Sequence, residues 1–295
     1  MYDNKKRRIG DRKDGYLLRH NSPLNKLMPH IMRYRYDALV YYEFDCDITK
    51  TEELLRSLRK NGHKNLSYTH LIMAVTARAF AEHPKMNRFV AGRKIYARKK
   101  LLFSLAAKTS ISESGKEFQT VTEVDEHDTL LEIADKFDEQ ISIIMKDQGE
   151  ANGTDKLLNI FFKLPTWFIA PAVGLFNSMN YHGIFPEALE KGLPFFSSAY
   201  VTNIGSLGGD ALYHHLYEFG TTSAFIGFGK KKTVYETQAD GSVKKKLLLP
   251  FKMVLDERIA EGFDFIAAMR TFTYYVENAD KLLERGTVDL VDPDI

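Results

Sequence analysis

Hydrophobic and polar residues recur along the chain with two periods, and together these periods predict both helices and strands. Apolar residues at helical spacing indicate helices over residues 23–32, 51–60, 68–82, 129–146, 186–191 and 263–278. Alternating patterns indicate strands over residues 38–48, 94–97, 101–111, 117–124, 197–204, 222–228, 232–237 and 244–256. Asp240-Gly241 predicts a hairpin turn between the last two strands.

Length and composition fit one large globular domain or two small ones. The chain has 295 residues, of which 44% are hydrophobic and 27% charged, which is enough to fill a sizeable core. Its formal net charge of +2 is too close to balance to predict a nucleic-acid partner. The single cysteine, Cys46, lies in an alternating strand and is predicted to be a small buried residue. One cysteine excludes an intramolecular disulfide and a thiolate metal cluster.

The first 21 residues differ from the rest in composition. Met1 to Asn21 is rich in lysine and arginine and poor in large apolar residues, so it is predicted to be a basic arm that is flexible or lies over the body. A solvated tail is favoured over a phosphate-binding one. No apolar run of the signal-peptide type opens the chain, and we therefore expect a cytoplasmic protein.

One stretch is far more apolar than the remainder, and it runs from Leu157 to Phe176. Its uncharged part, from Leu164, has about thirteen residues, whereas a bilayer span needs about twenty. Three interpretations remain, in order of preference: buried helices, a lid over an apolar acyl pocket, or an interfacial membrane anchor. Peripheral membrane contact is therefore considered but not favoured.

Two polar stretches stand at the ends of predicted strands. Asp256, Glu257, Arg258 and Glu261 lie between the last strand and the last helix. By residue type alone they favour a solvated turn over a polar site. Thr202, followed by the glycine-rich residues 203–209, alone predicts an ordinary strand end and turn.

Taken together, the two stretches resemble the catalytic domain of the 2-oxoacid dehydrogenase dihydrolipoyl acyltransferases, which share their fold with chloramphenicol acetyltransferase. Residues 256–262, Asp-Glu-Arg-Ile-Ala-Glu-Gly, resemble the family signature Asp-His-Arg-x-x-Asp-Gly, and residues 199–209 resemble its strand and glycine turn. Residues 83–87, His-Pro-Lys-Met-Asn, resemble a third family segment. The resemblance implies an α/β, chloramphenicol acetyltransferase-like fold over residues 22–295, an α+β two-layer sandwich with a mixed β-sheet flanked by helices. The apolar stretch is longer than we expect at the same place in the family, so we expect an apolar insertion near 157–185.

The resemblance also implies roles for single residues. In the family the signature His is the general base, and a Ser or Thr at the position of Thr202 donates a hydrogen bond to the oxyanion. Here Glu257 stands at the His position, and burial would have to raise the pKa of its carboxyl group for it to serve as a base. His214 and His215, just beyond the Thr202 strand, are candidates for a displaced base, and their spacing does not fit a metal pair.

A family arginine pairs with the last acidic residue of the signature, so we expect Glu261 to pair with Arg33 or Arg35. The competing interpretation is that both are ordinary surface arginines. Asp256 and Arg258 are expected to support the site.

The function implied is a CoA-dependent acyltransferase that moves an acyl group from a CoA thioester to a small thiol, alcohol or amine, without a metal. The family site lies between subunits of a homotrimer, so Glu257 is expected to face Thr202 across a subunit boundary. No lipoyl domain or subunit-binding segment precedes the catalytic region, which favours a stand-alone enzyme or a repurposed scaffold. The alternative is a catalytically inactive trimeric scaffold or an acyl- or CoA-binding homologue, favoured by the loss of the His and weakened by the retention of Thr202.

Overall fold

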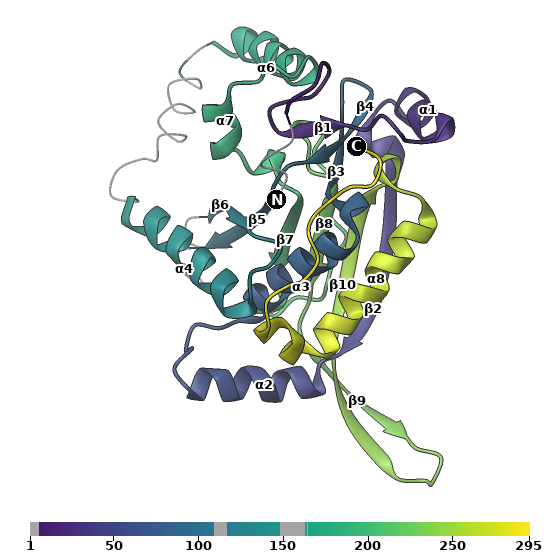
Figure 1. The fold of residues 1–295 in the computed structure, drawn as a ribbon. Coiled ribbons are helices and arrows are strands. Elements are labelled where there is room, and N and C mark those ends of the chain that lie inside the picture. The colour runs from purple at the N-terminus through teal and green to yellow at the C-terminus, as the bar shows by residue number, and fades with distance from the viewer. Residues whose placement is uncertain (1–5, 109–116, 148–162, 164) are drawn as a thin grey trace.

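A mixed β-sheet forms the centre of the computed structural model, which describes residues 6–108, 117–147, 163 and 165–295 (Figure 1). Its strand order is β2-β10-β8-β7-β5-β6, and β9 pairs with the outer part of β10. Strands β7 and β8 run parallel, as do β5 and β7, whereas the other pairs are antiparallel. The bounds are β2 Leu39–Asp47, β5 Leu101–Lys108, β6 Glu117–Val124, β7 Ala199–Asn203, β8 Ala224–Phe228, β9 Lys232–Thr237 and β10 Val243–Asp256.

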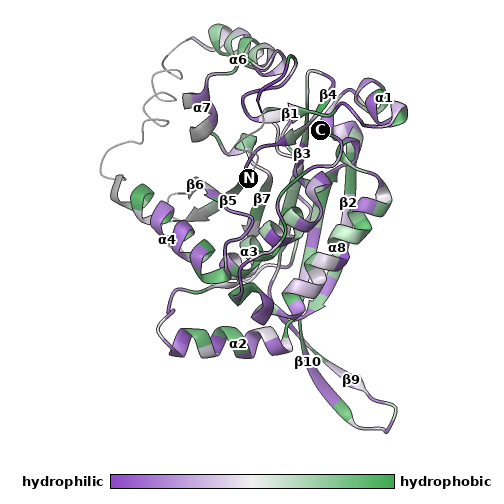
Figure 2. Cartoon of the chain, in the orientation of Figure 1, coloured by the Kyte–Doolittle hydropathy of each residue, from purple (hydrophilic) through white to green (hydrophobic). Residues whose placement is uncertain are grey.

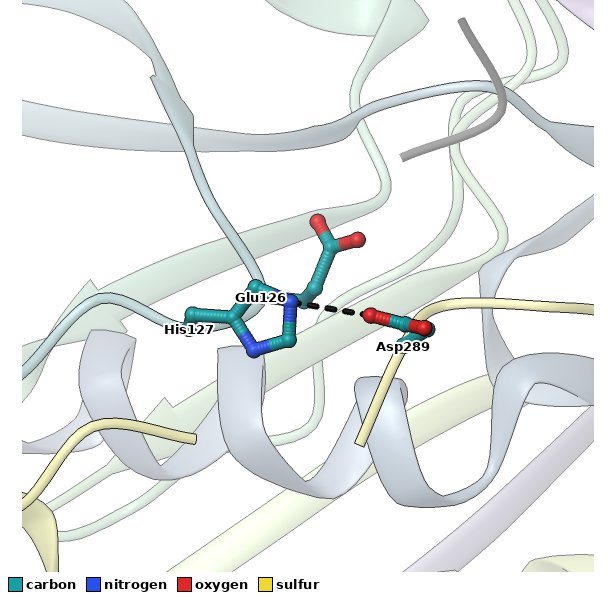
Figure 3. A group of neighbouring side chains, drawn as sticks. All are labelled: Glu126, His127 and Asp289. Carbon is teal, nitrogen blue, oxygen red and sulfur yellow. Dashed lines mark hydrogen bonds and ion pairs between the residues drawn. The ribbon is translucent and has the colours of Figure 1, made fainter. Parts of the chain in front are cut away.

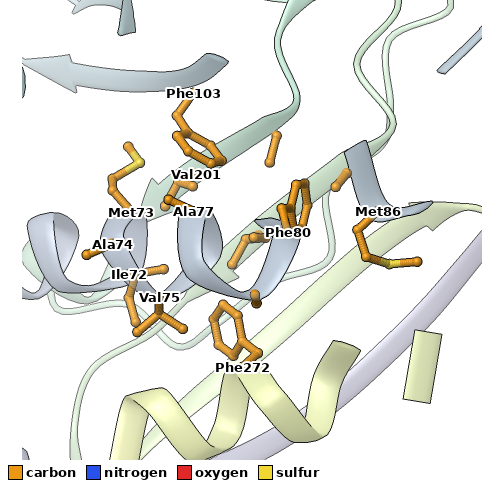
Figure 4. Packing of buried hydrophobic residues seen from close by; sticks show 14 of the residues in the cluster. Ile72, Met73, Ala74, Val75, Ala77, Phe80, Met86, Phe103, Val201 and Phe272 are labelled. Atoms are coloured by element: carbon orange, nitrogen blue, oxygen red, sulfur yellow. The ribbon is translucent and has the colours of Figure 1, made fainter. Parts of the chain in front are cut away.

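Helices cover one face of this sheet and bury the main core against it. Helix α3 (Tyr68–Glu82) begins at Ser67, whose hydroxyl accepts from the His70 N–H, and stops before Pro84. Nearly all its residues are buried, because α3 lies between the sheet and helix α8 (Gly262–Glu277). Figure 4 shows Phe80 of α3 among Phe103 and Val201 of the sheet and Phe272 of α8. Helices α2 (Thr49–Lys60) and α4 (Leu130–Asp147) extend this layer.

The opposite face of the sheet is covered by residues 211–219, which form no helix or strand. Leu216 from this segment packs on Tyr200, Phe225 and Val254, which point to this face from β7, β8 and β10. Tyr41, which pairs with Val254, is 53% exposed at the side of this patch. The described chain therefore leaves part of this sheet face open to solvent.

A small second sheet joins the N-terminal arm to the body. Its order is β1-β4-β3, with β1 Gly15–Leu17, β4 Lys94–Arg98 and β3 Arg88–Ala91. Asp11 and Arg12 of the arm are buried, and the Arg12 guanidinium donates to the Asn180 side-chain oxygen at 3.0 Å. The described arm residues around β1 thus lie over the body, which was one of the two expected arrangements, while the division of the chain at residue 22 stays a prediction.

Helix α6 (Thr166–Tyr181) carries the described part of the apolar stretch, and most of it is exposed. Trp167 is 76% and Leu175 60% exposed, so the preferred expectation of buried helices is wrong for these residues. Apolar positions are visible on α6 in Figure 2. The helix contacts the body through its C-terminal end, where Asn180 is buried and Phe176 stacks edge-on against Phe185. Residues 157–162 and 164 lie outside the described residues.

Among the described residues, no helix combines the length and apolar character needed to cross a membrane. Two short helices complete the periphery, α1 (Pro23–Ile31) and α7 (Glu187–Gly192).

The predicted elements are confirmed where the structure describes them, with ends shifted by a few residues, and Cys46 is buried as expected. Burial raises the pKa of its thiol to about 12. Residues 109–111 of the predicted strand 101–111 lie outside the described residues. Strand β3 was not predicted, because its four buried residues show no alternation of apolar and polar positions. The β9–β10 ribbon, with Gly241 at a positive φ in its turn, projects from the body (Figure 1).

Candidate active site

Thr202 lies near the C-terminal end of β7, on the partly open face of the sheet. It pairs with Gly227 of β8, and its methyl group lies 3.6 Å from where a Cβ on Gly227 would sit. The side chain is half-buried, and its hydroxyl has no hydrogen-bond partner among the described residues. A hydroxyl in this state can donate a hydrogen bond to a ligand.

The glycine-rich turn after Thr202 fixes the end of its strand. Asn203 caps the 3-10 helix Ile204–Leu207 by accepting from the Ser206 N–H, and its side-chain amide donates to Thr69 of α3 at 3.1 Å. A Cβ on Gly205 would lie 2.3 Å from the Gly229 carbonyl oxygen. The turn after β7 therefore packs backbone to backbone against the turn after β8, which only glycine permits.

Asp256 is the centre of a buried charge network at the end of β10. Its carboxylate accepts two bonds from Arg258, Nε–Oδ1 at 2.8 Å and Nη2–Oδ2 at 2.7 Å. Arg35 completes the network from the other side, with Nε 3.5 Å from Asp256 Oδ2. Burial lowers the pKa of Arg35, although the charge of Asp256 opposes this shift. Burial also acts to lower the pKa of Arg258, but the hydrogen bond and charge of Asp256 outweigh it, so the pKa of Arg258 is raised.

The expected pairing of Glu261 with Arg33 or Arg35 is wrong. Arg35 pairs with the first acidic residue of the signature, Asp256, and its guanidinium also donates to the Tyr217 carbonyl oxygen at 2.5 Å. Glu261 instead precedes helix α8, where it accepts from the Asn25 side chain at 3.1 Å. Arg33 is exposed, and its guanidinium lies over the Tyr34 ring. The reason is positional: Asp256 still belongs to the sheet face that Arg35 covers, whereas Glu261 has left it.

Thr202 and Glu257 lie toward opposite ends of the sheet within one chain. Thr202 pairs with Gly227, which pairs with Lys252 on β10, and Glu257 follows five residues later, 257 minus 252. At about 3.3 Å per residue and about 4.8 Å per strand, their backbones are roughly 20 Å apart. Glu257 is exposed, and its carboxylate forms no hydrogen bond or ion pair with a described residue. One chain alone therefore neither brings the two together nor buries the carboxyl group.

His214 lies much closer to Thr202 than Glu257 does. Its ring stacks on Phe225 at 4.1 Å, two residues before the Gly227 that pairs with Thr202. Its Nδ1 is 2.9 Å from the His215 carbonyl oxygen. Because a carbonyl only accepts, Nδ1 is the donor in this contact, which in a neutral imidazole would leave the lone pair on Nε2, the tautomer of a base.

His215 is exposed and stacks on the His214 ring at 4.5 Å. Partial burial and the neighbouring His214 lower the pKa of its imidazole. Because its ring stacks on His214, we assign His215 to packing against His214 and not to the role of a second base.

A separate group of possible metal ligands joins Glu126, His127 and Asp289 near the C-terminal segment (Figure 3). His127 Nδ1 lies 2.7 Å from the Gly286 carbonyl oxygen and Nε2 3.0 Å from Asp289 Oδ1. The bond to Gly286, followed by the Asp289 carboxylate, raises the pKa of His127 against a contribution from burial in the other direction. Both ring nitrogens are thus engaged as in a doubly donating imidazolium, and we assign this group to holding the C-terminal segment.

Sequence reasoning missed the Arg35–Asp256 pair and the part that residues 217–220 play in it. Tyr217 and Gly220 supply carbonyl oxygens to Arg35, and Glu218 accepts from the Arg35 backbone N–H at 2.8 Å. Carbonyl groups carry no sequence signal. The signal that could have been used is Asp256 itself, because its alternation with Val254 places it on the same sheet face.

Residues 32–140 match the model of a family described as the 2-oxoacid dehydrogenases acyltransferase (catalytic domain). A probable dihydrolipoamide acetyltransferase from Listeria monocytogenes 4b F2365 has a similar structure, with a TM-score of 0.53 at 13% identity over 92% of this chain and 98% of that chain. The cubic core of the pyruvate dehydrogenase multienzyme complex gives 0.53 at 13% identity over 89% and 93%. A chloramphenicol acetyltransferase gives 0.52 at 12% identity over 89% and 99%.

A sequence comparison with curated proteins finds no match. The predicted resemblance is therefore confirmed over residues 32–140 by sequence, and the predicted fold is confirmed by structure. The matched residues include the His83-Pro84 segment and end before Thr202 and the signature at 256–262.

Proposed function

We propose that this chain, which has the fold of the dihydrolipoamide and chloramphenicol acetyltransferases, transfers an acyl group from a CoA thioester to a small nucleophile. The observation that supports this most directly is Thr202, whose hydroxyl stands without a described partner on the partly open sheet face, next to a glycine turn that fixes the strand end. Preorganised donors of this kind stabilise the oxyanion of acyl transfer.

In the proposed reaction the thiol, hydroxyl or amine of the acceptor attacks the thioester carbonyl carbon while a base takes its proton. The carbonyl oxygen becomes an oxyanion, and the Thr202 hydroxyl donates a hydrogen bond to it. When the tetrahedral intermediate collapses, the carbon–sulfur bond breaks and the CoA thiolate leaves, accepting a proton from the protonated base. The chemistry needs no metal, because one donor and one base account for each charge that forms.

Two residues are candidates for the base, and they imply different assemblies. Glu257 acts only if a neighbouring subunit brings Thr202 to it and excludes water from its carboxyl group, since within one chain the two are roughly 20 Å apart. His214 needs no neighbour, because its ring, stacked on Phe225, lies on the same sheet face as Thr202. We favour Glu257 across a homotrimer boundary, following its place in the signature.

The open sheet face supports a homotrimer. Tyr41 and Tyr213 form an edge-to-face pair there, 53% and 38% exposed, and Leu212 is 40% exposed beside them. Aromatic residues at the centre of an exposed patch are typical of protein interfaces. The cubic core of the pyruvate dehydrogenase complex, which shares the fold, is itself an oligomeric assembly.

The direct test is CoA release from acetyl-, succinyl- and longer acyl-CoA with a small thiol acceptor, followed with a thiol-reactive dye. We expect Thr202→Val to lower kcat about 100-fold or more, while Thr202→Ser, which keeps the hydroxyl, loses much less. Glu257→Gln and His214→Gln then identify the base, since only the true base variant should remove the acidic limb of the pH–rate profile. Transfer that is unchanged in Thr202→Val would contradict the proposal.

The alternative is a trimeric scaffold or an acyl- or CoA-binding protein without catalysis. The exposed Glu257 favours it, because a carboxylate in water is a weak base toward a thiol. This alternative predicts no CoA release with any acyl-CoA, together with CoA binding or trimer formation that survives Glu257→Gln.

A further inference from the structure

A cavity of about 430 Å³ lies beside the Asp256 network, between the region after α1, the β3–β4 turn and the C-terminal end of α6. Four arginines line it: Arg33, Arg35, Arg93 and Arg258. One carboxylate, Glu218, lines it as well, and Asp256 stands behind Arg35 and Arg258. The guanidinium groups therefore outnumber the acidic groups that face them by four to two.

The four arginines are not equivalent. Arg35 and Arg258 are buried and share Asp256, so their guanidinium groups are held in place by the fold. Arg33 and Arg93 are exposed, and neither forms an ion pair with a described residue. The cavity thus combines two fixed cations in its wall with two exposed cations at its edge that form no ion pair with a described residue, an arrangement suited to an anion.

Arg93 adds a conformational observation. The two residues of the β3–β4 turn, Gly92 and Arg93, both have positive φ, 58° and 57°, as a type I′ hairpin requires. Gly92 admits no side chain, because a Cβ there would lie 2.5 Å from the Tyr181 carbonyl oxygen. Glycine would avoid the strain at position 93, which is of order 1 kcal/mol for a residue that carries a Cβ at positive φ. Retaining arginine there places a cation at the cavity.

We propose that this arginine cavity binds the phosphate group of a small molecule. Guanidinium groups match phosphate oxygens through paired N–H donors, and several together suit a doubly charged phosphate better than a single carboxylate. The volume is in the range of small-molecule sites, and Ser178 and His182 of the α6 end contribute further polar groups to its wall. The site is defined without Thr202 or Glu257 and so goes beyond the proposed acyl transfer.

Isothermal titration with inorganic pyrophosphate tests the proposal, and succinate serves as a carboxylate comparison. We expect saturable binding of pyrophosphate that is tighter than that of succinate and weakens with salt. The double variant Arg33→Ala, Arg93→Gly should raise the Kd at least tenfold. Lys245→Ala, which removes one exposed cation from the distant β9–β10 ribbon, should leave the Kd within about threefold.

The double variant retains Arg35, Arg258 and Asp256, and its folding is checked by thermal unfolding. Absence of saturable pyrophosphate binding, or equal binding by the wild type and the folded double variant, overturns the proposal. Repeating the titration with saturating CoA separates two sources of the phosphate: competition assigns it to the cosubstrate, and independent binding to a second molecule. Thr202→Val should keep pyrophosphate binding whether or not it transfers acyl groups, so the failure of one proposal is distinguishable from that of the other.

Discussion

Arg35 and Asp256, 221 positions apart, form an ion pair of 3.5 Å with side chains only 4% and 0% exposed. Because Arg258 binds the same carboxylate, one negative charge stabilises two buried guanidinium groups. The pair connects the 3-10 helix Arg35–Ala38, just before β2, to the end of β10 and thereby holds the turn that presents Glu257.

Asp256→Asn should destabilise the protein strongly, because it removes the buried carboxylate that Arg35 and Arg258 share. We expect a loss of about 3–5 kcal/mol in the free energy of unfolding, measured by urea denaturation. Asp45→Asn is the matched control, an exposed carboxylate on β2 without an ion pair to any described residue, and it should change stability by less than about 0.5 kcal/mol. Similar losses in both variants would show that the buried network contributes little.

Gly205→Ala should disturb the end of the Thr202 strand. The new methyl group would lie 2.3 Å from the Gly229 carbonyl oxygen, so the backbone must move, at a cost of about 1–3 kcal/mol. The movement should also reduce acyl transfer. Gly262→Ala, at the first position of α8 with nothing within 4 Å, should be neutral or slightly stabilising. Thermal unfolding of both variants, together with CoA release, checks this expectation.

Arg93→Gly should give a more stable protein than Arg93→Ala. Both remove the guanidinium, but only glycine removes the strain of a Cβ at a φ of 57°. We expect a difference of about 1 kcal/mol in the free energy of unfolding in favour of the glycine variant. Equal stabilities would show that the turn relaxes around a side chain at position 93.

Stability should fall slightly on raising the pH through the titration of His127. Its bonds to Gly286 and Asp289 raise the pKa of the ring above the unfolded value of about 6.5. A group with a raised pKa stabilises the fold below the unfolded value, and this contribution is lost as the pH rises through the folded pKa. The effect should be small, because the His127 ring is partly exposed and its partner Asp289 is largely exposed to solvent. Thermal unfolding between pH 5.5 and 8.5 should show this decline in the wild type and not in His127→Gln.

The periodicity of apolar residues was sufficient to predict the sheet and its helices, because burying one face of a strand or helix imposes this periodicity on the sequence. It placed Thr202 at the end of a strand and the signature after the last strand, and the structure agrees. Periodicity could not show that Arg35 pairs with Asp256 instead of Glu261, because the direction of Glu261 is set locally, where the Asp264 carboxylate accepts from the Glu261 N–H at 3.2 Å.

Three further features had no sequence signal of sufficient strength. Strand β3 has four residues and is buried throughout, so it shows no alternation. Residues 211–219 cover a sheet face without regular structure, and only their aromatic contacts reveal it. Helix α6 is apolar and nevertheless exposed. Hydropathy indicates that an apolar surface prefers to be covered, but it does not indicate what covers it.

The separation of Thr202 from Glu257 along the sheet has a consequence for mixtures of defective chains. If each catalytic centre is formed by Thr202 of one subunit and Glu257 of the adjacent subunit, a Thr202→Val chain and a Glu257→Gln chain would each be inactive alone. Refolded together, the two chains would restore activity to one another. In equal proportion they would recover about a quarter of the wild-type turnover, since one junction in four joins two intact halves. A base on the same chain as Thr202, such as His214, would leave Glu257→Gln active and give no such rescue.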